Sequence, residues 1–253
     1  MLHILLFFAC SSSIKITGNV TDIWNKPIGD VSIKMEGLEE AQISDANGDF
    51  VFTLPKETDG TLRFRADHEK YIYDVESIVY SKDLPKEDPV SVHFALYPKP
   101  PEKGFFGVGE SDYIHIQGQK LTQFNAPLEK ISGLVRIGKA RLNTVSPQFV
   151  YHSSLRKEEI KQIDLGVYEL HFKEHEEMTT LLGVQDIEVD LWIAKNKPIP
   201  FNIKTLDQEE MYVLEFPQPL EKGIYAFSGE YLEKDTDITL PKELQLAYPF
   251  EIK

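Results

Sequence analysis

Apolar and polar residues alternate along much of the first hundred positions, and this pattern predicts β-strands. In an extended chain, successive side chains point to opposite faces, so period-two alternation places one face in an apolar core. The alternation or enrichment in strand-forming residues recurs over residues 14–20, 31–35, 42–44, 50–54, 61–66, 71–80 and 90–96. Asn25-Lys26-Pro27 interrupts the ladder because proline lacks an N–H, and Asn47-Gly48 suits a tight hairpin. These features predict a small β-sandwich.

Three motifs lie at the turns of this region. They are Gly18-Asn19-Val20-Thr21-Asp22, Lys26-Pro27-Ile28-Gly29-Asp30-Val31 and Ser44-Asp45-Ala46-Asn47-Gly48-Asp49-Phe50. With the strand at 62–66 and Tyr71, they make residues 14–97 resemble the carboxypeptidase regulatory-like domain. The resemblance implies a transthyretin-like sandwich of about seven strands. That fold is shared with starch- and glycan-binding modules, so carbohydrate binding is expected by analogy.

A proline-rich segment at 98–104 predicts a linker, since proline stiffens the chain and cannot donate to a ladder. The 253 residues exceed the roughly 80 to 100 of one such sandwich. The second part, 105–253, matches no family that we recognise. Its expected elements are strands at 113–117, 134–137, 148–152, 167–172, 186–194, 211–216 and 223–227, an edge strand at 247–252, and a helix at 154–163 capped by Ser154. We therefore expect an all-β protein of two β-sandwich domains, with at most one short helix in the second.

The single cysteine, Cys10, excludes a disulfide within the chain. It follows the apolar run 4–9 and precedes three serines, so residues 1–13 resemble the end of a bacterial lipoprotein signal peptide with its tether. The resemblance implies an acylated Cys10 and an outer-membrane lipoprotein on the periplasmic or surface face of the envelope. The alternative is a buried N-terminal strand with an inert thiol. No later run reaches the roughly 18 apolar residues of a spanning helix, so the lipid is the expected membrane contact.

Acidic residues outnumber basic ones, at 41 against 27, which gives a formal charge of −14. Such a field disfavours nucleic acid and anionic lipid as partners. A glycan or an envelope protein is the expected partner, and no cofactor is expected. Aromatic residues make up 11% of the chain, and most are expected in the cores. Trp24, beside a turn, and Trp192 are the candidate ligand-binding rings.

Two groups of residues have the chemistry of metal ligands. Asp45, Asn47 and Asp49 alternate like the oxygen ligands of a calcium loop, but the glycine precedes the third of them and no bidentate glutamate follows. This spacing favours a hairpin turn. His171 and His175 stand among glutamates, but four residues of a strand span about 13 Å. An acidic surface turn is the favoured interpretation.

The chain offers few candidates for catalysis. No serine occupies a glycine-flanked elbow, and the glycines of 105–111 lack the lysine and the following helix of a phosphate loop. We therefore expect no enzyme but a non-catalytic, lipid-anchored binding or scaffolding protein of the cell envelope. Two alternatives remain open: a protein-binding subunit of an envelope assembly, and a hydrolase with a metal at His171 and His175.

Overall fold

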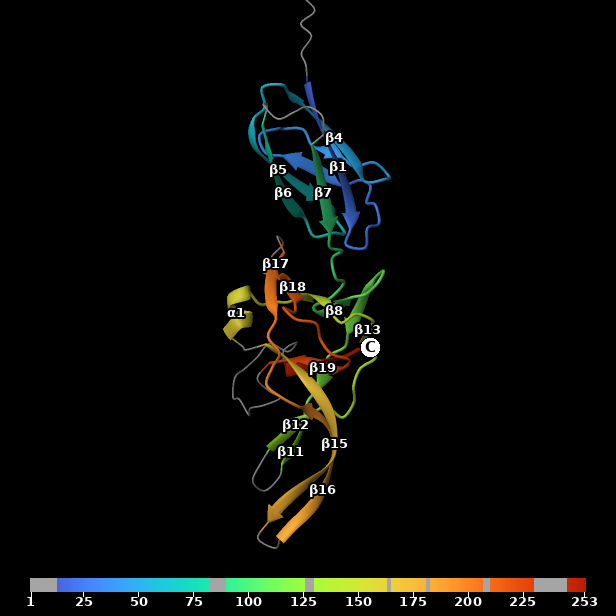
Figure 1. Ribbon diagram of the computed structural model, residues 1–253, viewed down its shortest axis with the longest axis vertical. Helices are drawn as coiled ribbons and strands as arrows, with labels where there is room; N and C mark the ends of the chain where they lie inside the picture. The colour runs from blue at the N-terminus through green and yellow to red at the C-terminus, as the bar shows by residue number, and fades with distance from the viewer. Residues whose placement is uncertain are drawn as a thin grey trace, which may run out of the picture. The chain divides into compact units, whose positions relative to one another are not determined.

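The computed structural model describes residues 13–81, 90–125, 130–162, 165–180, 183–206, 210–229 and 245–253 (Figure 1). Cys10 and the rest of the signal-like segment lie outside these residues, except for Ser13. The chain divides into two compact units, unit 1 (Met1–Lys99) and unit 2 (Pro100–Lys253), and the division falls inside the segment expected as a linker. None of the described helices has the length and apolar character needed to cross a membrane.

Unit 1 contains two sheets in its described residues, with strand orders β4-β1-β7 and β3-β2-β5-β6. β1 pairs antiparallel with β4 and parallel with β7. The strands are β1 (Ser13–Asp22), β2 (Ser32–Met35), β3 (Gln42–Ile43), β4 (Asp49–Pro55), β5 (Gly60–Asp67), β6 (Asp74–Tyr80) and β7 (Ser91–Leu96). Each of the seven coincides with a predicted run, so the strand prediction for this unit is confirmed.

The inward positions of the two sheets form the core of unit 1. Phe52, Phe64 and Phe94 are almost completely buried, and every second residue of β4, β5 and β7 is buried with them. Gly18 is required on β1 because a Cβ atom there would lie 2.0 Å from the Phe50 ring. The alternation read from the sequence therefore corresponds to real burial.

Unit 2 is a second sandwich, with sheet orders β17-β18-β14-β8-β9 and β10-β20-β19-β15-β16. A short β13 also pairs with β20, and β11 pairs with β12. The strands are β8 (Gly104–Val108), β9 (Tyr113–Ile116), β10 (Gln119–Lys120), β11 (Thr122–Asn125), β12 (Lys130–Gly133), β13 (Arg141–Leu142), β14 (Gln148–His152), β15 (Gly166–Thr180), β16 (Gly183–Ala194), β17 (Asn202–Thr205), β18 (Met211–Glu215), β19 (Gly223–Ser228) and β20 (Leu246–Ile252). The described part of this unit holds one short helix, α1 (Lys157–Gln162), so the predicted all-β class is confirmed.

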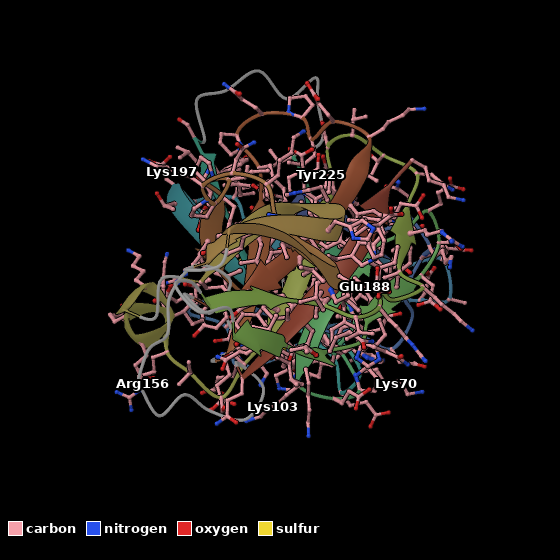
Figure 2. The ribbon with its side chains drawn as sticks, turned by 90° about the horizontal axis from the view of Figure 1, so that it is seen from below. Lys70, Lys103, Arg156, Glu188, Lys197 and Tyr225 are labelled. Carbon is pink, nitrogen blue, oxygen red and sulfur yellow. The ribbon has the colours of Figure 1, made fainter. Side chains whose placement is uncertain are left out.

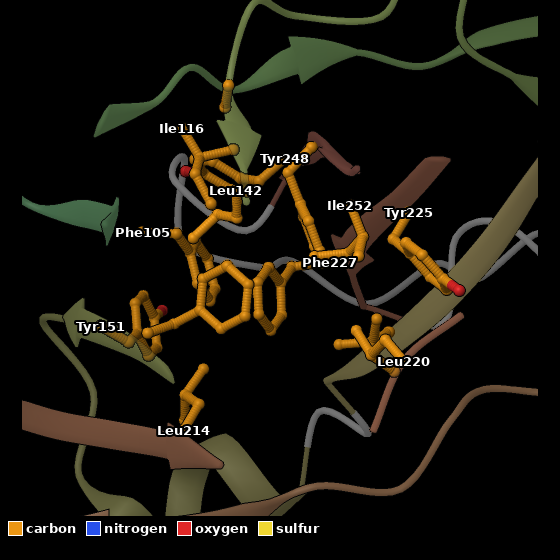
Figure 3. Packing of buried hydrophobic residues seen from close by; sticks show 14 of the residues in the cluster. Phe105, Ile116, Leu142, Tyr151, Leu214, Leu220, Tyr225, Phe227, Tyr248 and Ile252 are labelled. Carbon is orange, nitrogen blue, oxygen red and sulfur yellow. The ribbon is translucent and has the colours of Figure 1, made fainter. Parts of the chain in front are cut away.

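Stacked aromatic rings occupy the centre of unit 2. The Phe105 ring on β8 stacks on Tyr151 from β14 with centroids 4.1 Å apart and on Phe227 from β19 at 4.6 Å (Figure 3). Tyr248 on β20 approaches the same ring at 4.6 Å. Since β8 and β14 belong to one sheet and β19 and β20 to the other, these contacts join the two layers.

The structure corrects three expectations for unit 2. The predicted strand at 134–137 is wrong, because only Leu134 pairs, through an isolated bridge to Trp192. The helix begins at Lys157 rather than near Ser154, and the Glu159 carboxylate accepts a hydrogen bond from the Arg156 N–H just before it. Residues 247–252 do not form an edge strand, because β20 pairs with β19 on one side and with β10 and β13 on the other.

Several strands of unit 2 run where none was expected, namely β8, β10, β11, β12, β13 and β17, and β15 runs further than expected. β8 gives no alternating signal because both its faces are covered, with Phe105 in the core and Phe106 stacked on His115 at 4.9 Å. β15 continues through the region expected as an acidic turn. Its ladder with β16 shifts register between Lys173 and His175, where Asp190 has a positive φ of 49°. The irregularity is a β-bulge, and β15 and β16 remain paired on both sides of it.

Candidate functional site

Strands β15 and β16 form a long hairpin (Figure 1). This hairpin carries a pair of aromatic side chains. Phe172 on β15 lies directly opposite Trp192 on β16 in the ladder. Their ring centroids are 5.3 Å apart, with an angle of 50° between the ring planes. Phe172 is 42% exposed and Trp192 is half-buried, so the two rings form an open aromatic surface. We call Phe172 and Trp192 the aromatic pair.

Backbone hydrogen bonds hold the aromatic pair in place. The N–H of Trp192 donates to Leu134 at 2.8 Å, and the carbonyl of Trp192 accepts from the Leu134 N–H at 2.9 Å. The backbone N–H and C=O of Trp192 therefore both point away from β15, so Phe172 and Trp192 are a non-hydrogen-bonded pair. Side chains approach most closely in pairs of this kind.

The aromatic pair continues an apolar cluster on the outer face of its sheet. Along β15, Val167 faces the main core, whereas Tyr168 and Leu170 are buried in a separate cluster on the opposite face. Phe172 follows Leu170 by two residues and thus points to that same face. The buried residues of this cluster give way to exposed ones at the aromatic pair. The aromatic pair is therefore the solvent-exposed end of the cluster.

Carboxylates lie next to the aromatic pair at the bulge. Glu174 and Asp190 are both exposed, and each is two residues along its strand from one of the two rings. Ionised carboxylates only accept hydrogen bonds. The surface therefore combines flat apolar rings with hydrogen-bond acceptors that suit ligand hydroxyl groups.

The structure places His171 and His175 on β15 rather than on a turn. His171 lies opposite Ile193 and His175 opposite Glu188, which Figure 2 labels on the hairpin. Both histidines are exposed. In the described part of the chain, no three His, Cys, Asp or Glu side chains gather closely enough to hold a metal ion.

Asp45, Asn47 and Asp49 form a turn, as the spacing favoured. Asp45 Oδ1 accepts hydrogen bonds from the N–H groups of Asn47 at 2.8 Å and Asp49 at 3.0 Å. The Asn19 side chain donates to Asp49 Oδ1 at 2.9 Å. The Asp45 and Asp49 carboxylates thus accept hydrogen bonds that stabilise the hairpin turn.

Trp24 lies in the β1–β2 loop of unit 1 and is half-buried. Asp22 Oδ1 holds this loop by accepting from the N–H groups of Trp24 and Lys26, and the Lys26 ammonium lies 5.5 Å from the Trp24 ring centroid. Burial, together with the Asp22 charge, raises the pKa of the nearby Tyr71 above its ordinary value. Lys26 already interacts with one face of the Trp24 ring, so Trp24 offers a ligand less open surface than the aromatic pair does.

Sequence reasoning singled out Trp192 but missed Phe172. Residues 167–172 were expected as one strand and 186–194 as another, but no local pattern reports which residues pair. If the two runs are assumed to pair as a hairpin, residues that lie opposite each other share a face of the sheet. That assumption was the signal that could have identified Phe172 as the partner of Trp192. The pairing itself comes from the structure.

No family model matches the chain, and no curated protein sequence matches it. The Streptococcal ancillary pilin is similar in structure at 10% identity and a TM-score of 0.29, over 97% of this chain and 60% of the pilin chain. A DUF3823 family protein from Parabacteroides merdae is similar at 9% identity and a TM-score of 0.25, over 96% of this chain and 100% of that one. A Bacteroides uniformis protein with a proposed carbohydrate-binding role is similar at 8% identity and a TM-score of 0.25, over 85% and 86% of the two chains. TM-scores this low support no inference about function.

Proposed function

We propose that the protein is a non-catalytic carbohydrate-binding module of the bacterial cell envelope, anchored by a lipid on Cys10, and that its aromatic pair binds the ligand. The single observation that supports this function is the exposed Phe172 ring beside Trp192. The apolar C–H face of a sugar ring packs against an aromatic ring, and neighbouring carboxylates accept hydrogen bonds from the hydroxyl groups of the sugar. The exposed Glu174 and Asp190, each two residues from one of the rings, support that role.

The hairpin suits binding because its rings are already ordered. Trp192 is paired on one side with β15 and on the other with Leu134, so little conformational freedom is lost when a ligand binds. An open sheet face fits a polysaccharide chain. The proposal needs no metal or cofactor.

We expect Phe172→Ala to weaken binding to an immobilised polysaccharide by about tenfold, because the ligand loses one of two stacking rings. The measurement is a glycan array with the full chain, followed by titration of the glycans that give signal. Since Phe172 is exposed, this variant should unfold at the same temperature as the wild type. Trp24→Ala is the matched control, because it removes a half-buried aromatic ring from unit 1.

Two results would contradict the proposal in different ways. Loss of binding in Trp24→Ala with full binding in Phe172→Ala would place the site in unit 1. Absence of signal on every glycan class would remove the carbohydrate function. The protein-binding alternative would then take its place.

The lipid anchor has its own test. We expect the intact protein from a native membrane fraction to lack residues 1–9 and to carry acyl chains on Cys10, because a lipoprotein cysteine becomes the mature N-terminus. Intact-mass spectrometry measures this directly, and Cys10→Ser provides the control that should remain unprocessed. An unmodified cysteine in a chain that retains Met1 would contradict both the anchor and the envelope location.

A further inference from the structure

Unit 2 has an open depression on a part of its surface that the proposed function does not use. Its volume is about 380 Å³, at the lower end of the range for small-molecule sites. The depression forms where the turn between β8 and β9 meets the segment that contains β13 and the residues after it. Such a size fits a ligand of one or two sugar rings.

Backbone contacts fix both sides of this depression. The turn closes through a hydrogen bond of 3.0 Å from the Gly109 N–H to the Asp112 carbonyl, and Asp112 Oδ1 accepts from the Tyr113 N–H at 2.7 Å. On the other side, the N–H of Lys253 donates to the Leu142 carbonyl. The walls are therefore formed before any ligand arrives.

The lining has one apolar part and one polar part. Val108, Ile114, Leu142 and the Tyr113 ring provide apolar surface. The polar part is rich in acceptors, with the carboxylates of Glu110 and Asp112 and the amide of Asn143. Neither the Glu110 nor the Asn143 side chain has a hydrogen-bond partner among the described residues.

The charges around the depression disfavour an anionic ligand. Arg141 is the lining cation, and its Nε lies 2.7 Å from Glu251 Oε2, so its charge is already paired. Glu110 and Asp112 leave the lining acidic, and the chain carries a charge of −14. A carboxylate or sulfate would meet repulsion here.

From this lining we infer a second ligand site, in which a small neutral saccharide lies with the C–H face of its ring on Tyr113 and its hydroxyl groups on Asp112 and Asn143. A sugar ring has the same two-sided character as the depression, with apolar C–H groups on one side and hydroxyl donors at its rim. The site goes beyond the proposed function, because the aromatic pair is not part of it. This second site would bind a single sugar residue, whereas the aromatic pair offers an open surface to a polysaccharide chain.

The test is saturation-transfer NMR and titration of the full chain with the methyl glycosides of glucose, galactose and mannose. We expect a dissociation constant on the order of 1 mM for the best of them, as is usual for a ligand of roughly a dozen heavy atoms. Asp112→Asn keeps an oxygen for the Tyr113 N–H, and Asn143→Ala removes an exposed amide, so both variants should fold. Each should raise the dissociation constant about five- to tenfold.

Phe172→Ala serves as the cross-control. Methyl glycoside binding should be unchanged in this variant even where polysaccharide binding is lost. Conversely, a wild type that binds no polysaccharide but still binds a glycoside through Asp112 and Asn143 would contradict the proposed function and support this site.

Three outcomes would overturn the inference. The first is absence of saturation transfer from every neutral glycoside at tens of millimolar. The second is transfer that Phe172→Ala abolishes and the two depression variants leave intact, since the sugar would then lie on the aromatic pair. The third is tighter binding of methyl glucuronide or of methyl glucosaminide by more than tenfold, which would show that the site selects charge.

Discussion

Phe105→Ala should lower the free energy of unfolding of unit 2 by about 3 to 5 kcal/mol, the usual loss when a buried phenylalanine is truncated in a core. Phe105 is fully buried and contacts rings from both sheets, with Tyr151, Phe227 and Tyr248 all within 4.6 Å between centroids. Removal of the ring leaves a cavity that flat, rigid neighbours fill poorly. Denaturant unfolding of the full chain measures the loss.

The two tryptophans allow each unit to be followed separately, because Trp24 lies in unit 1 and Trp192 in unit 2. In a Trp24→Phe background, tryptophan fluorescence reports unit 2 alone. Phe105→Leu is the matched control and should cost about 1 to 2 kcal/mol, since it retains most of the apolar volume. A loss below about 1 kcal/mol in Phe105→Ala would show that this ring is not central to the core.

Gly48→Ala should destabilise unit 1 by about 3 kcal/mol or more through two separate effects. Gly48 has a φ of +82°, which a residue with a Cβ adopts at a cost of about 1 to 2 kcal/mol. A Cβ at this position would also lie 2.2 Å from the Val20 carbonyl oxygen. The oxygen belongs to the backbone of β1, so relief of the clash requires movement of the β3–β4 turn away from that strand.

Gly37→Ala separates the two effects. Gly37 has a similar φ of +88°, but no atom beyond its two chain neighbours lies within 4 Å of the position its Cβ would take. This variant should therefore show only the conformational cost. Unfolding followed by Trp24 fluorescence in a Trp192→Phe background gives both values, and equal losses in the two variants would contradict the role assigned to the Val20 contact.

The strands of unit 1 could be read from the sequence because their signals are local. The alternation in β4, with Phe50, Phe52 and Leu54 buried, depends only on the two-residue period of an extended chain. The turn at Asn47-Gly48 likewise depends on the φ angles that those residue types accept. Prediction was poorer where a strand is covered on both faces, as in β8, because burial of both Phe105 and Phe106 removes the alternation.

The candidate sites could be predicted only in part. Trp192 was recognisable as a large aromatic residue in a strand, but its partner depends on the register of β15 and β16, which joins residues 20 positions apart. The depression depends on two segments about 30 residues apart, the turn at 109–112 and residues 141–144. Glu110 and Asn143 have no feature in the sequence that relates them.

The sequence by itself determined the all-β class, most of the strands and the hairpin character of the Asp45–Asp49 turn, because side-chain period and backbone φ are properties of a few neighbouring residues. The tertiary structure alone decided which strands lie at an edge, that Phe172 stands opposite Trp192, and that the β8–β9 turn meets the β13 segment. These features arise from pairing and packing between residues far apart in the chain. Register and contact of that kind are set by the burial of whole sheets against each other, so no local window of sequence contains them.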